Sequence, residues 1–279
     1  MMMSVLTLLL AATALQYQTD TTVAVPANAR LHLKNDAGRI EVTSWNRNEL
    51  RIQAEHGSRD QIEIERRNGV VTVRASRSRG RPIVDYRLTV PASMSLVVGG
   101  VHAEVHVTGV QGDIQAESVE GDITIRGGGG AMRLNSVEGD IIVDGARGRV
   151  QINGVDGDIS VSNVVGDVSV ETIDGDLTLE NVDATNVDAS TVDGDIVYRG
   201  TIKDGGRYRF TSHDGDLMLA VPAGINATVS VATFDGDFES DFSVRLERTQ
   251  GRRFRFVLGS GSATVELESF DGAIRLRRR

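Results

Sequence analysis

Apolar residues along this chain recur with a period of nine. Between residues 118 and 180 a glycine returns at every ninth position, followed in most units by an acid and then by alternating apolar and polar residues. The units are SVEGDITIR, GGGGAMRLN, SVEGDIIVD, GARGRVQIN, GVDGDISVS, NVVGDVSVE and TIDGDLTLE. Such a period is typical of solenoids, in which each unit is one short strand that cannot bury its apolar side alone and must stack on its neighbours.

The alternation within one unit predicts which side chains face the core. In SVEGDITIR, Val119, Ile123 and Ile125 are expected to point inward and the acids outward. Because nine is odd, a turn must reset this alternation between units, and we place it at the Arg126–Gly127 junction and its equivalents. The acidic units recur every 18 residues, which favours a flattened, two-sided coil of 18 residues over a three-sided coil of 27.

Towards the C-terminus the period loosens but persists. The units TVDGDIVYR, SHDGDLMLA, TFDGDFESD and SFDGAIRLR begin at residues 191, 212, 233 and 269, so the spacing grows to 19, 21, 21 and 36. A solenoid must cover its open strand edges, which would otherwise pair with other chains. We therefore expect residues 248–256 and 263–267, in the longest gap, to form a closing cap.

The N-terminal third departs from the repeat. NDAGRIEV at 35–42 echoes it and predicts one early coil, after which the pattern breaks into separate alternating strands. These are expected at 50–54, 62–64, 70–73, 84–90 and 96–98. The sequence thus predicts an all-β protein, a parallel β-solenoid of roughly 18–21-residue coils, with an N-terminal β cap over 23–98 and repeats with a C-terminal cap over 99–279.

The first residues have the composition of an export signal. Val5 to Leu15 is an apolar run of signal-peptide length, and Ala12-Thr13-Ala14 offers a cleavage site of small residues, so we assign 1–22 to a signal peptide. No Lys or Arg precedes the run, and a first β-strand is the alternative. The run is shorter than the ~20 apolar residues that span a bilayer. We predict an exported protein, periplasmic, cell-surface or secreted, whose mature chain has no transmembrane span.

Composition and charge limit the classes of ligand and partner that this chain can bind. Without cysteine there is no disulfide and no cysteine-ligated metal. The net charge is −9, and the acids are concentrated between residues 100 and 245, so we expect no nucleic-acid partner for the repeats. The basic C-terminal residues Arg275 to Arg279 are expected to form a solvated tail, with contact to an anionic surface as the alternative.

Two columns of carboxylates are the most suggestive chemical feature. If coils stack at ~4.8 Å, like charges repel by roughly 0.9 kcal/mol per adjacent pair even in water, and something must offset this. Calcium bridging successive coils would do so, as would hydrogen bonds to backbone amides at the glycine corner. The chain departs from the calcium-binding nonapeptide GGxGxDxUx, whose ligand aspartate is replaced by Ile159. The candidate metal ligands are Glu120, Asp122, Glu138, Asp140, Asp156, Asp158, Asp174 and Asp176.

A second candidate metal site lies in VHAEVHV. His102, Glu104 and His106 share one face of a strand, and imidazole and carboxylate are both zinc ligands. The alternative is an exposed polar face opposite the valines. We expect no catalytic residues, since the tight units leave little room for a cleft and no Ser/His/Asp arrangement or phosphate-binding loop is found. Trp45, the single tryptophan, gives weak support for stacking on sugars.

Three segments together resemble a known family. The GDI-centred repeats, the N-terminal NDAGRIEVTSW and the DYRLTVP stretch ahead of the repeats are similar, in this order, to the bacterial putative-adhesin family of β-strand-repeat proteins, a domain family of unknown function. The likeness runs from about residue 23 to the end. It implies an exported or envelope-associated stack of β-coils and brings no catalytic residues with it.

These observations lead to a functional prediction with two alternatives. We expect a non-catalytic binding or structural surface, an adhesin whose ligand is a protein or a glycan. The first alternative is a cation-binding scaffold of the cell envelope that has no receptor of its own. The second, less favoured, is a polysaccharide-active β-helix enzyme. No cofactor is expected apart from calcium, should the carboxylate columns bind it.

Overall fold

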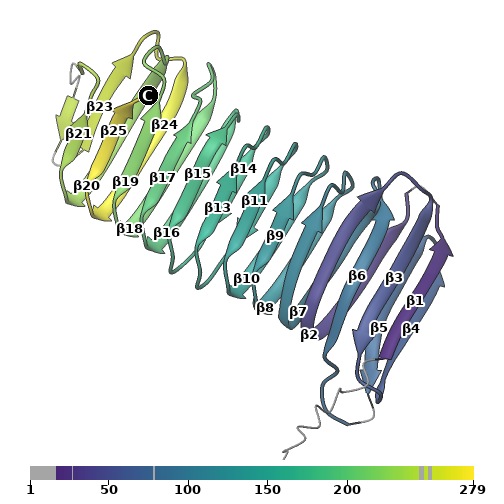
Figure 1. Cartoon of the computed structure of the whole chain (residues 1–279). Coiled ribbons are helices and arrows are strands. Elements are labelled where there is room, and N and C mark those ends of the chain that lie inside the picture. Colours follow the sequence, from purple (N-terminus) through teal and green to yellow (C-terminus); the bar gives the residue numbers. More distant parts are fainter. Residues whose placement is uncertain (1–16, 27, 78, 245–247, 251–252) are drawn as a thin grey trace, which may run out of the picture.

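The computed structural model describes residues 17–279 except 27, 78, 245–247 and 251–252. These residues form one elongated stack of β-strands, with no helix among them (Figure 1). The apolar run 5–15 lies outside the described residues, whereas residues 17–22 of the expected signal segment belong to the first strand. Cleavage after Ala14 would leave that strand whole, and the domain boundaries stay predictions.

The strands fall into three groups along the chain. The N-terminal strands are β1 (Tyr17–Ala24), β2 (Arg30–Trp45), β3 (Glu49–His56), β4 (Asp60–Arg67), β5 (Val70–Arg77), β6 (Val84–Pro91) and β7 (Ser95–Thr108). The repeat strands are β8 (Ile114–Glu120), β9 (Ile123–Arg126), β10 (Met132–Glu138), β11 (Ile141–Asp144), β12 (Val150–Asn153), β13 (Ile159–Ser162), β14 (Val168–Glu171), β15 (Leu177–Val182), β16 (Asn186–Asp193), β17 (Ile196–Gly200), β18 (Arg207–Asp214) and β19 (Leu217–Val221). The C-terminal strands are β20 (Ala227–Asp235), β21 (Phe238–Ser240), β22 (Arg248–Gln250), β23 (Arg253–Leu258), β24 (Ala263–Asp271) and β25 (Ile274–Arg278).

Each coil contributes one strand to each of two parallel columns. Strands β8, β10, β12, β14, β16 and β18 pair in that order in the first column. Strands β9, β11, β13, β15, β17 and β19 do the same in the second. Corresponding residues are 18 apart at first, then 19 and 21. The predicted two-sided coil of a parallel β-solenoid is confirmed.

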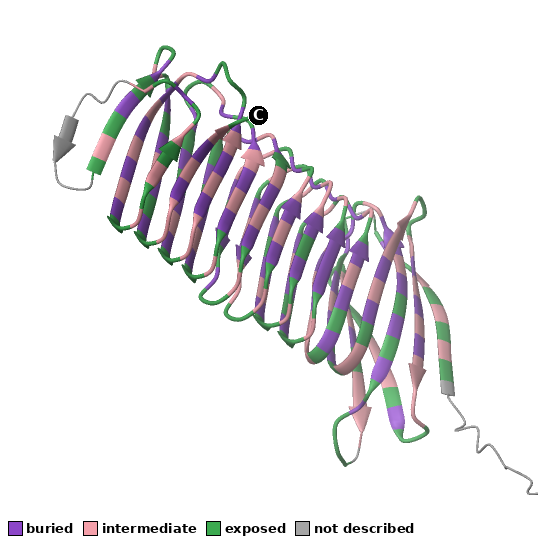
Figure 2. Ribbon diagram, turned by 60° about the vertical axis from the view of Figure 1, so that its left-hand side comes forward, coloured by how far each residue is buried: buried purple, intermediate pink, exposed green. Residues whose placement is uncertain are grey.

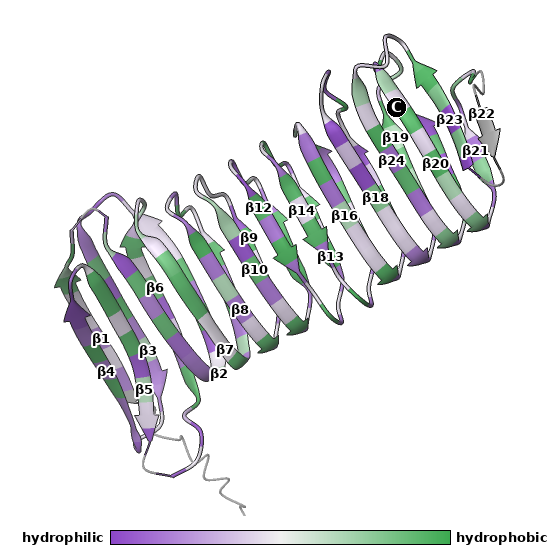
Figure 3. Ribbon diagram, turned by 180° about the vertical axis from the view of Figure 1, so that it is seen from behind, coloured by the Kyte–Doolittle hydropathy of each residue, from purple (hydrophilic) through white to green (hydrophobic). Residues whose placement is uncertain are grey.

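The core lies between the two columns and follows the alternation of the sequence. Figure 2 shows buried residues alternating with partly exposed ones along each strand, and Figure 3 shows the hydropathy following the same rhythm. Ile123 and Ile125 are fully buried, as predicted. Where the coils lengthen, aromatic residues fill the wider core: the Tyr198 ring lies 5.0 Å from Phe210 and 6.4 Å from Tyr208, centroid to centroid. The longer coils therefore pack around larger side chains.

The N-terminal strands close one end of the stack. Strand β2 pairs along both its halves with β7 and so forms the predicted early coil. Its two halves are covered on the other side by β5 and β6, onto which the antiparallel strands β4 and β3 pack. Strand β1 completes the edge by pairing with β3. All five strands expected in this region are present.

The C-terminal coil does not lie at the end of the stack. Strands β24 and β25 insert between the coil of β18 and β19 and that of β20 and β21. The prediction that 263–267 belongs to the closing cap is therefore wrong, because these residues lie inside the first column. The part of 248–256 that the structure describes does cover the end, since β23 pairs antiparallel with β20 and β22 with β23.

This insertion also explains the basic C-terminus. Arg275 bonds Asp216 of the preceding coil, and Arg277 pairs with Asp241 at 3.1 Å and with Glu239. The Arg278 guanidinium lies 5.3 Å from the centre of the Phe242 ring. The expectation of a solvated tail is wrong, because the chain end is held between two coils whose carboxylates compensate its charges.

Candidate functional site

Each acidic repeat turns a tight corner at its glycine, and this corner organises the candidate surface. Gly157 has a φ of 133°, and a Cβ at this position would lie 2.6 Å from the carbonyl oxygen of Gly139 in the coil before. Only glycine fits such an approach. The corner is a second reset of the alternation, in addition to the bend expected at Gly127, where φ is 75°.

A hydroxyl three positions before the glycine ties the corner to the previous coil. The Oγ of Ser118 donates to the carbonyl of Ala103, and Ser212 and Ser269 donate in the same way to Gly194 and Gly215, each at 3.1 Å. These hydroxyls are almost fully buried. These three serines therefore have a structural role, whereas the equivalent hydroxyls of Ser136 and Thr233 are buried without a hydrogen-bond partner among the described residues.

The carboxylates after the glycine form a hydrogen-bonded ladder. Oδ1 of Asp122 accepts the backbone N–H of Asp140 at 3.0 Å, and Oδ1 of Asp140 accepts that of Asp158 at 2.9 Å. The ladder continues with Asp158 to Asp176, Asp176 to Asp195, Asp195 to Asp216 and Asp216 to Ala273. This is the arrangement expected if backbone amides, and not calcium, stabilise the post-glycine column.

At the end of this ladder Asp216 is also bonded by an arginine. Burial raises the pKa of Asp216, but hydrogen bonds from the Arg275 guanidinium and the Ala273 N–H outweigh it and hold this pKa below its usual value. The charged form of Asp216 is thus stabilised by the inserted C-terminal coil.

The carboxylates before the glycine stack in register on the outside of the corner. Parallel bridges join Glu138 to Asp156, Asp156 to Asp174 and Asp174 to Asp193, and Glu120 lies opposite Glu138. All are exposed. Glu138, Asp156 and Asp174 form no ion pair with any described residue. No three acidic or histidine side chains in the described part of the chain are grouped so as to hold a metal ion. Calcium binding stays a prediction.

The three residues of VHAEVHV have separate partners. His102 lies opposite Glu120, and its Nδ1 is 2.7 Å from the Glu120 Oε2, so it caps the pre-glycine column. Glu104 binds Arg39 at 2.8 Å, with the His106 Nε2 at 3.7 Å. His106 therefore lies near Glu104, whereas His102 contacts Glu120 of the pre-glycine carboxylate column.

The most conspicuous surface feature is a column of exposed apolar side chains immediately before these acids. We call it the apolar corner; it consists of Val119, Val137, Val155, Ile173, Val192, Phe270 and Phe234. Each is between 41% and 64% exposed, and each is followed by an exposed acid. The prediction that Val119 points inward is wrong, because the alternation resets at the glycine and not only at the end of the unit.

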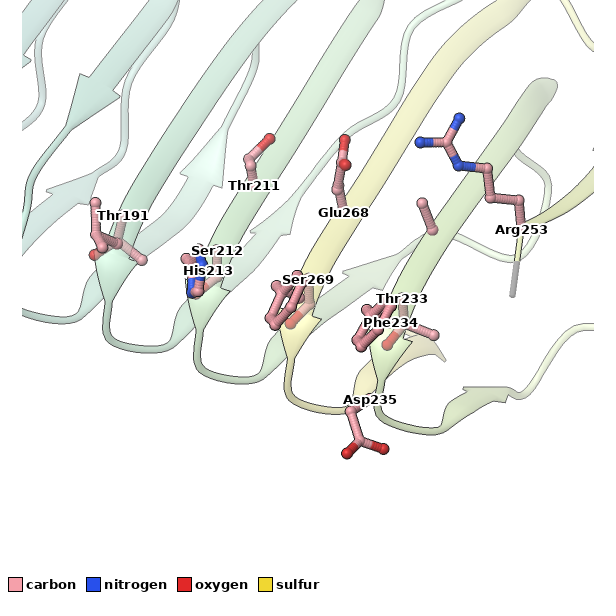
Figure 4. Close-up of a pocket in the computed structure, with 13 residues that line it drawn as sticks. Thr191, Thr211, Ser212, His213, Thr233, Phe234, Asp235, Arg253, Glu268 and Ser269 are labelled. Atoms are coloured by element: carbon pink, nitrogen blue, oxygen red, sulfur yellow. The ribbon is translucent and has the colours of Figure 1, made fainter. Parts of the chain in front are cut away.

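The C-terminal end of the apolar corner is aromatic. The Phe234 and Phe270 rings stack with centroids 4.7 Å apart and 4° between their planes, and His213 stacks on Phe270 at 4.8 Å. Figure 4 shows His213 and Phe234 at strand ends along this edge. They line a groove of about 910 Å³ whose polar lining includes Thr191, Arg253 and Glu268. Phe234, at the end of the row, is the most exposed member.

A second groove follows the same corner at its other end. It has a volume of about 710 Å³ and is lined by Val119, Val137 and Val155 together with Asn135 and Asn153. Between the two grooves Ile173 is 53% exposed and continues the column. The apolar corner is thus a continuous strip along the repeats, bordered on one side by carboxylates.

Comparison with known protein families decides where the chain belongs. Residues 13–277 match the family described as Toastrack DUF4097, a domain of unknown function. The chain belongs to the Toastrack family. This confirms the resemblance to an adhesin-like family of β-strand repeats that the GDI units indicated.

Solved structures similar to this Toastrack chain are distant. One is described as a putative cell adhesion protein from Clostridium sporogenes, with 10% identity, a TM-score of 0.26 and coverage of 95% of this chain and 100% of that chain. Another is described as a putative lipid binding protein from Parabacteroides distasonis, with 7% identity, a TM-score of 0.34 and coverage of 93% and 97%. The search of curated proteins gave no match. The described part of the Toastrack chain contains no helix that could cross a membrane.

Sequence reasoning missed the apolar corner of this Toastrack protein although its signal was present. The residue before the pre-glycine acid is aliphatic at Val119, Val137, Val155, Ile173 and Val192, is then His213, and is phenylalanine in the last two units. Strict alternation assigns these residues to the core. In the coils of Val119, Val137, Val155, Ile173, Val192 and Phe270, the glycine two positions later has a positive φ, and this corner turns the side chain outward.

Proposed function

We propose that this Toastrack protein is an exported, non-catalytic binding solenoid that acts in adhesion at the cell envelope, and that the apolar corner is its binding face. The observation that carries the proposal is the row of exposed large apolar side chains at the corner, which is aligned over the length of the repeats and interrupted only by the exposed His213 in the described coils. Contiguous apolar patches on soluble proteins mark interaction sites. The fold does not require them, since His213 occupies the same position.

The geometry supports binding by repetition. Coils in parallel pairing stack at ~4.8 Å, so the column presents equivalent contacts to an elongated partner. Fully burying an aliphatic or aromatic side chain contributes roughly 1.5–3 kcal/mol, so covering the half-exposed ones contributes about 1 kcal/mol each. Four or five coils would therefore supply about 4–5 kcal/mol, roughly half of the free energy of a micromolar complex, which is about 8 kcal/mol.

The same repetition supports a non-catalytic role. Asp156 and Asp158 recur as Asp174 and Asp176 in the next acidic unit and again in later ones, so no carboxylate pair is singled out for acid and base chemistry. The post-glycine carboxylates accept backbone hydrogen bonds in addition. A surface partner, protein or glycan, fits these features better than a reacting substrate.

A cation-loaded scaffold of the envelope is the second candidate. The stacked pre-glycine carboxylates, which form no ion pair among the described residues at Glu138, Asp156 and Asp174, favour it. Such a scaffold would depend on calcium for stability and would not need the apolar corner. Two experiments therefore distinguish the candidates: ligand binding by a variant of the apolar corner, and thermal stability with and without calcium.

Capture from envelope extracts tests the proposed binding face. The purified chain, a corner variant with Val137→Ser, Val155→Ser and Ile173→Ser, and a control with Ile142→Ser are immobilised, and retained proteins and glycans are compared. Ile142 is exposed to a similar degree but lies on the flat face of β11. We expect ligands retained by the unmodified chain and the control to be lost from the corner variant. Equal capture by all three would contradict the proposal.

A further inference from the structure

We propose that the apolar corner binds a cationic amphipathic α-helix of another polypeptide, laid along the solenoid axis. This inference rests on the proposed function, because it assigns a partner class to the same corner. Three properties of the surface carry it: its charge pattern, its spacing, and the backbone hydrogen bonds that already join successive coils at the corner.

The charge pattern specifies a basic partner. Each residue of the apolar corner is followed by an exposed carboxylate, as in Val137 with Glu138, Val155 with Asp156 and Ile173 with Asp174, so each of these coils forms one rung of paired apolar and acidic side chains. Those three carboxylates lack an ion-pair partner among the described residues. A partner that buries the apolar side chains must also neutralise this row, which an apolar stripe bordered by Lys or Arg does. Anionic polymers and anionic membranes would be repelled.

The spacing of the rungs suits a helix. Strands stack at ~4.8 Å, and a helix repeats its face with a pitch of about 5.4 Å. Over three steps the two repeats differ by roughly 2 Å, which flexible side chains accommodate. An extended strand places side chains on one face about 6.7 Å apart and is roughly 2 Å out of register after a single step, a mismatch that the helix reaches only after three.

Backbone pairing between coils at the corner disfavours addition of a strand. The N–H of Gly139 donates to the Asp156 carbonyl at 3.1 Å, and the N–H of Asp156 donates to the Val137 carbonyl at 2.8 Å. Comparable bonds join the following coils, for example from Asp174 N–H to the Val155 carbonyl at 2.8 Å. An incoming strand finds few donors or acceptors here, whereas a helix satisfies its own backbone and needs only side-chain contacts.

The two grooves along the apolar corner provide contact sites for the side chains of such a helix. The groove of about 710 Å³ beside Val119, Val137 and Val155 receives aliphatic side chains. At the other end, the stacked rings of Phe270 and Phe234 line the groove of about 910 Å³ and provide a larger apolar anchor. A helix spanning both would contact the whole corner.

Fluorescence anisotropy with a defined peptide tests the inference. The probe is a labelled Leu/Lys peptide of about five turns with one apolar stripe; the controls are the same composition scrambled and a Leu/Glu version. The full chain is expected to bind the striped Leu/Lys peptide at least about tenfold more tightly than either control. Two corner variants should weaken this binding by roughly tenfold: Val155→Ser with Ile173→Ser, and Asp156→Asn with Asp174→Asn. The Ile142→Ser control should not change it.

The variants also report the mechanism. Binding should weaken with added salt in the unmodified chain, and less so after Asp156→Asn with Asp174→Asn. Equal affinity for the striped and scrambled peptides, or equal affinity of the corner variants and the unmodified chain, would overturn the inference. If the peptide fails while the capture of envelope ligands still depends on the corner, the helix assignment is wrong and the binding face stands. If neither depends on the corner, both are wrong.

Discussion

The backbone N–H of Ala273 donates to Oδ1 of Asp216 at 2.8 Å, across 57 positions of sequence. In the coils before it the same rung is formed by residues 18 to 21 apart. The bond continues the post-glycine ladder without a break. Between these two residues the chain first forms β20 to β23 at the end of the stack and then returns to fill the position next to β18 and β19. The C-terminus is therefore enclosed between two coils, and the end of the stack is covered by an internal segment.

This enclosure makes stability sensitive to acid at a defined residue. The pKa of Asp216 is held below its usual value of 3.8, so its charged form stabilises the fold above that pH. The contribution is lost as the pH falls through the lowered pKa. We expect Asp216→Asn to lower the melting temperature at pH 7 and the difference from the unmodified chain to shrink below about pH 4. Thermal melts of both proteins from pH 7 to pH 3 measure it, and a difference that grows on acidification would contradict the assignment.

Two buried tyrosines provide a matched test of the core. The hydroxyl of Tyr208 donates to the Ala184 carbonyl at 2.7 Å and accepts the Lys203 N–H at 2.8 Å. The hydroxyl of Tyr86 is also buried but has no hydrogen-bond partner among the described residues. Tyr208→Phe leaves two backbone groups unpaired and should reduce the free energy of unfolding by about 1–3 kcal/mol. Tyr86→Phe should leave it unchanged or raise it. Denaturant unfolding of the two variants measures this, and equal effects would show that the Tyr208 bonds do not stabilise the fold.

The glycine corner predicts a strongly position-dependent cost of a methyl group. At Gly157 a Cβ would lie 2.6 Å from the Gly139 carbonyl oxygen and φ is 133°, whereas a Cβ at Gly224 meets nothing within 4 Å and its φ is ordinary. We expect Gly157→Ala to cost roughly 1–3 kcal/mol or more and Gly224→Ala to be neutral or slightly stabilising. Comparable melting temperatures for the two variants would contradict the close approach of coils at the corner.

Calcium separates the two explanations of the carboxylate columns. Because Asp140, Asp158 and Asp176 take part in the backbone ladder, we expect no more than a small rise in melting temperature when millimolar calcium replaces EDTA. A ligand that binds only the folded state must stabilise it in proportion to its affinity. A large rise that disappears when the pre-glycine residues are changed, by Glu138→Gln, Asp156→Asn and Asp174→Asn, would instead establish metal sites and favour the scaffold.

The coils were predictable from the sequence because their signal is local and repeated. The nine-residue period, the two kinds of unit and the glycine in register determine the two-sided coil and its core residues, such as Ile123 and Ile125. The hydrogen-bonded alternative for Asp122 and Asp140 also followed from the repeat.

What the sequence did not reveal depends on long-range order and on the geometry of one corner. Nothing local distinguishes a coil stacked next in sequence from one inserted later, so the position of β24 and the partners of Arg275 could not be inferred. The exposure of Val119 depends on a positive φ at Gly121, which overrides the alternation that would place this valine in the core.

Site-specific cross-linking in cells expressing the protein tests the central claim most directly. A photoreactive amino acid is placed at Val155 in the apolar corner or, as the control, at Ile142 on the flat face, and adducts are identified after illumination. The two positions are equally exposed, at 41% and 42%. We expect discrete adducts from position 155 and none from position 142. Adducts at both positions alike, or at 142 alone, would contradict a binding face along the apolar corner.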